Sequence, residues 1–121
     1  MAATVLIVDD HARFRSLART LLDGEGFEVV GEAHDGASAL RSAGRLRPDV
    51  VLLDIQLPDM DGFAVAEQLA ETEDPPKVVL VSTRDAASYR RQLDGASAKG
   101  FIAKDDLSGP ALAALVADDD G

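Results

Sequence analysis

Short apolar runs along the chain alternate with segments whose apolar residues recur every three or four positions. Five of these runs are too short for helices and are bounded by polar, Gly or Pro residues, which is typical of strands buried in a parallel sheet. They cover residues 4–8, 27–33, 50–53, 77–81 and 101–103. The alternation predicts a single α/β domain, because 121 residues are too few for two such domains.

The segments between the runs predict five helices. Their apolar residues follow helical spacing at about residues 14–22, 37–43, 63–70, 85–93 and 107–116. Gly24 and Gly26 end the first helix, Pro48 closes the second, and Pro110 fits the first turn of the last. In the helix at 85–93, Tyr89 falls on the inward side.

Polar side chains of complementary charge follow four of the strands. Asp9 and Asp10 come after the first strand, Asp54 after the third, Ser82 after the fourth and Lys104 after the fifth. Because the carboxyl ends of parallel strands meet at one edge of a sheet, we expect these side chains to lie together. Carboxylates about 4 Å apart repel by on the order of 4 kcal/mol at an effective dielectric of roughly 20, so the cluster favours a bound cation. Oxygen ligands favour a hard ion such as Mg²⁺.

These residues and their order resemble the response-regulator receiver domain of two-component signalling. The phosphoacceptor pattern DIQLPDMDG begins at Asp54, and the match covers nearly the whole chain. The residues that follow the last two strands, Ser-Thr-Arg-Asp after the fourth and Lys-Asp after the fifth, are most similar to those of receivers of NarL/LuxR-type transcription factors. The resemblance implies a flavodoxin-like (CheY-like), doubly wound fold with strand order 2-1-3-4-5 and five flanking helices. The receiver domain would cover residues 1–117, followed by an acidic tail at 118–121.

The resemblance also implies the chemistry of the site. Asp54 would accept a phosphoryl group from a histidine kinase or a small phosphodonor, and the domain would catalyse only its own phosphorylation and dephosphorylation. Asp10, Asp54 and the backbone carbonyl of Gln56 would bind Mg²⁺ directly, with Asp9 acting mostly through water. Lys104 would neutralise the phosphoryl oxygens, since phosphoryl transfer depends mainly on positioning and electrostatics.

A switch is implied as well. Ser82 would hydrogen-bond the phosphoryl group once it is present, and Phe101 matches the switch aromatic of the family. Gln56 and Arg84 lie two residues after Asp54 and Ser82, at positions that tune the loss of phosphate. The signal would leave through the face of the fourth helix, fifth strand and fifth helix.

Dimerisation through this same face is a further expectation. Tyr89, Arg90 and Arg91 are the candidate contacts between the two copies of the chain.

Composition restricts the partners. A formal net charge of -10 opposes direct binding of nucleic acid, so control of transcription would need a DNA-binding domain outside this chain. No apolar run approaches the roughly 20 residues of a membrane span. The N-terminus lacks a secretory signal, which favours the cytoplasm. The absence of Cys excludes disulfides and thiol chemistry.

Other interpretations remain open from the residues alone. Acids after a strand often cap the next helix, and a lone lysine is commonly a solvated charge. His11 and His34 are expected on the surface, because neither has a metal-ligand spacing to another His. Asp105 follows Lys104 where many receivers have a proline, which predicts a trans peptide bond or a special loop. A single-domain receiver and a phosphorylation-independent pseudo-receiver are the alternative functions.

Overall fold

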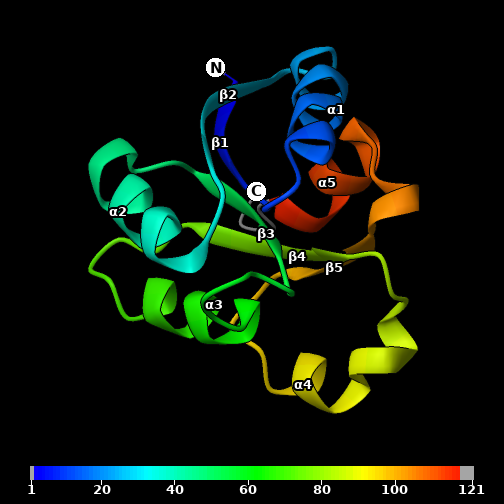
Figure 1. The fold of residues 1–121 in the computed structure, drawn as a ribbon. Helices are drawn as coiled ribbons and strands as arrows, with labels where there is room; N and C mark the ends of the chain where they lie inside the picture. Colours follow the sequence, from blue (N-terminus) through cyan, green and yellow to red (C-terminus); the bar gives the residue numbers. More distant parts are fainter. Residues whose placement is uncertain (1, 118–121) are drawn as a thin grey trace.

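The chain folds into five parallel strands that alternate with helices, in a computed structural model that describes residues 2–117. The elements are β1 (Ala3–Val8), α1 (Ala12–Asp23), β2 (Phe27–Ala33), α2 (Gly36–Leu46), β3 (Val50–Asp54), α3 (Gly62–Ala70), β4 (Lys77–Ser82), α4 (Arg90–Asp94), β5 (Gly100–Ala103) and α5 (Gly109–Val116). Short 3-10 turns cover Ala86–Tyr89 and Lys104–Asp106. The strand order is β2-β1-β3-β4-β5, which confirms the predicted fold class (Figure 1).

The sheet is covered on both faces. Helices α1 and α5 lie on one face, and α2, α3 and α4 lie on the other (Figure 1). Alternate residues of one strand therefore enter different cores: Ile7 packs with the α1 and α5 side, and Leu6 with the α2 and α3 side. Both side chains are fully buried, and each such leucine or isoleucine contributes roughly 2 kcal/mol to stability. This two-sided burial explains why the strands are continuous apolar runs.

The register of the sheet aligns the polar residues that follow the strands. Paired positions at the carboxyl end are Val8 with Leu53, Asp54 with Val81, and Ser82 with Ala103. Asp9 and Lys104 are each the next residue along the chain. Four strand ends thus bring their polar side chains to one edge of the sheet.

The segment after β4 differs from the expected continuous helix at 85–93. Asp85 caps a 3-10 turn by accepting a hydrogen bond from the Ser88 N–H at 3.3 Å, and α4 begins only at Arg90. Between them Tyr89 has φ -124° and ψ 19°, outside the helical region. The prediction was wrong here because the tertiary contacts of Tyr89 outweigh local helical spacing.

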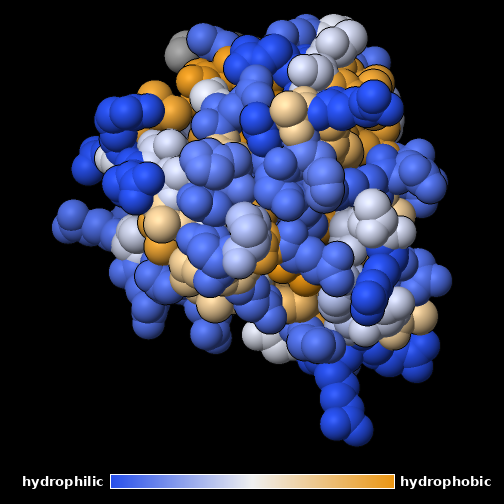
Figure 2. Space-filling view, in the orientation of Figure 1, coloured by the Kyte–Doolittle hydropathy of each residue, from blue (hydrophilic) through white to orange (hydrophobic). Residues whose placement is uncertain are grey.

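Two other details of the helices bear on the predictions. Pro110 lies in the first turn of α5, as expected, and Ser108 caps that helix by accepting from the Ala111 N–H at 3.1 Å. Leu17 has apolar helical spacing in α1 but is 52% exposed. Hydrophilic side chains cover most of the face seen in Figure 2, with apolar groups showing between them.

No helix within residues 2–117 combines the length and apolar character that a bilayer crossing requires. The acidic tail at 118–121 lies outside the described residues.

Replacing Gly62 by Ala tests how closely α3 must approach β3. A Cβ at Gly62 would overlap the Asp54 carbonyl oxygen and lie 2.7 Å from Ile55 Cα, and these backbone atoms cannot move aside cheaply. Gly62→Ala should lower the free energy of unfolding by about 2 kcal/mol, as overpacking does. Urea unfolding measures this change.

Gly44→Ala is the matched control, because a Cβ there meets nothing within 4 Å. It should raise the free energy of unfolding by about 0.5 to 1 kcal/mol, since alanine is the better helix former. A Gly62→Ala protein as stable as the wild type would show that the close approach is not needed.

Candidate functional site

Asp9 is a buried carboxylate at the end of β1, with no exposed surface. Its Oδ1 accepts a hydrogen bond from the His11 N–H at 2.8 Å. Its Oδ2 accepts no hydrogen bond from the described residues, although the Lys104 Nζ forms an ion pair with it at 2.5 Å. A buried carboxylate oxygen without a hydrogen bond requires a neighbouring cation, so this corner of the site is built for positive charge.

Asp54 lies beside Asp9 at the end of β3 and is 3% exposed. Its Oδ1 accepts from the Gln56 N–H at 3.0 Å, and its Oδ2 accepts from the Lys104 Nζ at 3.4 Å. Burial raises the pKa of the Asp54 carboxyl to about 6; the Gln56 N–H and the Lys104 ammonium oppose this rise, and the Asp9 carboxylate adds to it. A cation placed beside Asp54 would favour its ionised form.

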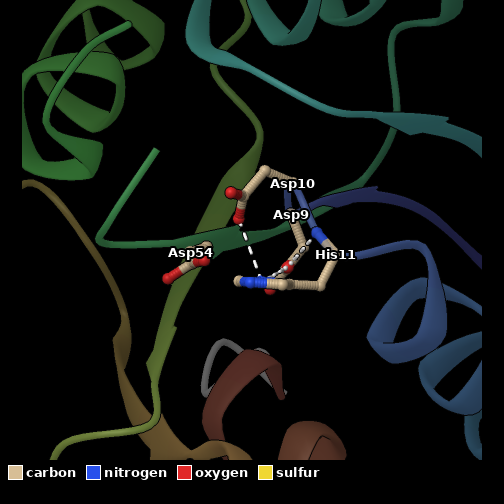
Figure 3. Close-up of side chains that lie close together, drawn as sticks. All are labelled: Asp9, Asp10, His11 and Asp54. Atoms are coloured by element: carbon tan, nitrogen blue, oxygen red, sulfur yellow. Dashed lines mark hydrogen bonds and ion pairs between the residues drawn. The ribbon is translucent and has the colours of Figure 1, made fainter. Parts of the chain in front are cut away.

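Asp10 and His11 complete an acidic cluster with Asp9 and Asp54. One potential ligand atom from each of the four residues lies within 4.8 Å of the others (Figure 3). The His11 Nδ1 lies 3.0 Å from Asp10 Oδ1 and 3.2 Å from Asp9 Oδ1. The imidazole is 67% exposed, as a surface residue should be, yet its place in the cluster was missed. Its only sequence signal was its position directly after the paired acids.

Lys104 connects the two buried carboxylates. Its side chain is only 10% exposed, and its ammonium lies 4.6 Å from the centroid of the Phe14 ring of α1. This cation–π contact holds the Lys104 ammonium against α1 and next to the two buried carboxylates. The Lys104–Asp105 peptide bond is trans, in agreement with the expectation from Asp105.

Ser82 lies at the same edge but faces a different set of partners. It is 1% exposed, and its Oγ accepts from the Arg84 N–H at 3.1 Å. The Tyr89 hydroxyl lies 3.1 Å from the same Oγ atom. Tyr89 is 7% exposed, as its inward helical spacing predicted, so it offers little surface to a second copy of the chain.

The aromatic neighbours of Tyr89 come from two other elements. Its ring centroid lies 6.0 Å from that of Phe63 on α3 and 6.2 Å from that of Phe101 on β5. Phe101 is half-buried. Tyr89 therefore contacts both residues to which the family resemblance assigns a switch role, Ser82 and Phe101.

Two acids of the loop after β3 have structural roles that sequence reasoning missed. Asp59 accepts hydrogen bonds from the Gly36 N–H at 2.7 Å and the Ala37 N–H at 3.0 Å. An acid from another segment thus caps the N-terminus of α2. These two hydrogen bonds lower the pKa of Asp59. Asp61 caps α3 by accepting from the Phe63 N–H at 2.7 Å. The loop after β3 thus contributes neither of these two acids to the acidic cluster.

The other predicted residues have exposed side chains. The backbone N–H groups of Gln56 and Arg84 bind Asp54 and Ser82, which places these two residues at the rim of the site. His34 is 68% exposed, and its Nε2 lies 3.5 Å from Asp35 Oδ2, so it is a surface residue as expected.

Comparison with known proteins agrees with this geometry. Residues 5–116 match the family described as the response regulator receiver domain. The response regulator GacA of Pseudomonas aeruginosa is 38% identical over 101 residues, which cover 83% of this chain and 47% of GacA. The chemotaxis protein CheY of Bacillus subtilis is 36% identical over 104 residues, which cover 86% of this chain and 87% of CheY.

A solved structure is similar over nearly the whole chain. It is the signal receiver domain of NarL from Mycobacterium tuberculosis, with a TM-score of 0.85 and 34% identity, covering 97% of this chain and 98% of that one. The chain spans about half the length of several curated relatives that it matches, including GacA. The match over residues 5–116 and these relatives show that the chain belongs to the response regulator receiver domain family of two-component systems, with NarL-type receivers among its relatives.

Proposed function

We propose that this domain is a phosphoacceptor that receives a phosphoryl group on Asp54 from a sensor histidine kinase or a small phosphodonor. The observation that supports this most is the placement of Asp54, whose buried carboxylate lies between the Lys104 ammonium and the acidic cluster. The domain catalyses only its own phosphorylation and dephosphorylation, and it acts in the cytoplasm. Residues 1–117 form the receiver.

The acidic cluster fits Mg²⁺. Its donors are mainly carboxylate oxygens, and among the described residues the buried Asp9 Oδ2 has only the Lys104 ammonium beside it. We assign direct binding to Asp10, Asp54 and the Gln56 carbonyl, with Asp9 acting through water. When bound, Mg²⁺ supplies positive charge for the phosphoryl oxygens.

The residues of the chain have separate tasks in the transfer. A carboxylate oxygen of Asp54 forms the new bond to phosphorus while the bond to the leaving group of the donor breaks. The Lys104 ammonium, already within 3.4 Å of Asp54 Oδ2, neutralises a phosphoryl oxygen. Ser82 donates its hydroxyl proton in a hydrogen bond to another oxygen. This interaction favours one arrangement of the loop after β4, and Phe101 carries the change to the surface.

The output is proposed from the relatives. Since the chain matches about half of GacA, we propose that transcription is controlled through a DNA-binding domain beyond this receiver. The formal net charge of -10 is unsuited to direct DNA binding. The face formed by α4, β5 and α5 transmits the signal and can form a homodimer, with exposed Arg90 and Arg91 as contacts. A single-domain receiver is the second candidate, because the match covers 87% of CheY.

Intact mass spectrometry tests the proposed function. After incubation with acetyl phosphate or phosphoramidate and Mg²⁺, the wild-type mass should increase by one phosphoryl group. Asp54→Asn should show no increase, because its amide is not a nucleophile, and the wild type without divalent metal should show little. Folded protein that gains no mass with either donor would instead support the pseudo-receiver interpretation.

The raised pKa of Asp54 predicts a pH-dependent stability difference. Because the folded pKa is about 6 and the usual value is 3.8, the folded state holds this proton more tightly than the unfolded state. The ionised Asp54 therefore destabilises the metal-free fold above pH 6 by on the order of 2 to 3 kcal/mol. Asp54→Asn should raise the free energy of unfolding by this amount at pH 7.5, and the gain should shrink as the pH falls from 6 towards 4.

Urea unfolding across this pH range measures the effect. Asp23→Asn, at an exposed position at the end of α1, is the control and should show no comparable gain. Mg²⁺ should narrow the difference at pH 7.5, since it binds the wild-type cluster more tightly. No gain for Asp54→Asn at neutral pH would contradict the assigned burial cost.

Gln56 and Arg84 should tune the lifetime of the phosphoryl group. Both side chains are exposed at the rim, and their backbone N–H groups remain when the side chains are truncated. Gln56→Ala and Arg84→Ala should change the dephosphorylation rate several-fold and leave the melting temperature nearly unchanged. The rate is followed by the decay of the phosphorylated mass. Gln68→Ala and Arg41→Ala, at exposed sites on α3 and α2, are the controls; equal rates in all variants would contradict the assignment.

A further inference from the structure

The Ser82 hydroxyl is already engaged before any phosphoryl group is present. Its Oγ accepts from the Arg84 N–H and lies 3.1 Å from the Tyr89 hydroxyl. Ser82 is 1% exposed and Tyr89 is 7% exposed, so water does not readily replace either partner. A buried hydroxyl left without a hydrogen bond is destabilised. The Tyr89 hydroxyl therefore competes with a phosphoryl oxygen for the Ser82 hydroxyl.

The Tyr89 side chain also joins Ser82 to the signalling side of the domain. Its ring lies between Phe63 on α3 and Phe101 on β5, with centroid distances of 6.0 and 6.2 Å. Its backbone lies at the junction between the 3-10 turn Ala86–Tyr89 and α4. A movement of the Tyr89 hydroxyl is therefore coupled through one side chain to β5 and to the start of α4.

We propose that Tyr89 is a positioning residue that holds the Ser82 hydroxyl in the unphosphorylated state and must release it for switching. The inference rests on the proposed function, because it requires Ser82 to donate to a phosphoryl oxygen. The 3.1 Å contact lets either hydroxyl donate, and we assign the one hydroxyl proton of Ser82 to the Tyr89 oxygen in the resting state, so that this proton is not available to a phosphoryl oxygen. Turning towards the phosphoryl group leaves the buried Tyr89 hydroxyl unpaired, and this drives the ring and its aromatic neighbours to rearrange.

Tyr89→Phe isolates the hydroxyl, because it keeps the ring that packs between the two phenylalanines. Without the competing hydrogen bond, Ser82 is free to turn towards a phosphoryl group. The variant should bind beryllofluoride, a phosphoryl mimic, with Mg²⁺ about fivefold more tightly than the wild type. In a Ser82→Ala background the same substitution should change the affinity little, since the interaction it removes is already absent.

Tyrosine fluorescence provides a second readout that does not depend on the Tyr89 variant. The chain has one Tyr and no Trp, so its emission comes from Tyr89 alone. Beryllofluoride should change the wild-type emission with the same midpoint as binding. Ser82→Ala should alter the emission before ligand is added and lose most of the ligand-induced change. Ser82→Thr keeps the hydroxyl and should behave like the wild type.

The outcomes separate this inference from the proposed function. If the wild type is phosphorylated on Asp54 but Tyr89→Phe binds beryllofluoride with equal or weaker affinity, the inference is overturned and the function stands. An equal gain in the Ser82→Ala background would also overturn it. Failure of the wild type to accept a phosphoryl group would overturn the proposed function and, with it, the role of Tyr89.

Discussion

Burial of two neighbouring carboxylates at the end of an apolar sheet is the constraint on which the rest of the site depends. Asp9 is fully buried and Asp54 is 3% exposed, and β1 and β3 pair so that the two acids come together. Such a pair is unfavourable unless positive charge lies close by. Lys104 supplies that charge from the end of β5, with its ammonium near both carboxylates and over the Phe14 ring. The position of the lysine is thus part of what allows the acids to be buried.

The charge of the same arrangement favours a second cation. A single ammonium offsets only part of the negative charge of three acids, and it forms an ion pair with Asp9 Oδ2 without a hydrogen bond. Burial raises the pKa of Asp54, and the neighbouring Asp9 carboxylate adds to that rise. The buried carboxylates are electrostatically unfavourable in the resting domain. The proposed binding of Mg²⁺ and a phosphoryl group would relieve this unfavourable energy. Stability and function are therefore linked at Asp54.

The other half of the site is uncharged. Ser82, Tyr89 and Phe101 form a chain of contacts from the edge of β4 to β5. Tyr89 interrupts the helix that the local sequence favours, because its hydroxyl and its ring both find partners outside the segment. The short α4 helix that follows has no fully buried residue within Arg90–Asp94, so its packing opposes movement less than the packing of α1 or α3 does.

The sequence by itself determined the strands, the strand order through the family pattern, and the polar residues that meet at the carboxyl edge. It could do so because two-sided burial produces continuous apolar runs, and because parallel strands align their ends. Only the tertiary structure decided three other features: the Asp59 cap on α2, the place of His11 beside the acids and the hydrogen bond between Tyr89 and Ser82. Each joins residues through side-chain directions and loop paths, which hydrophobic spacing does not encode. The exposure of Leu17 has the same cause, since the stripe that a helix buries depends on how the helix lies on the sheet.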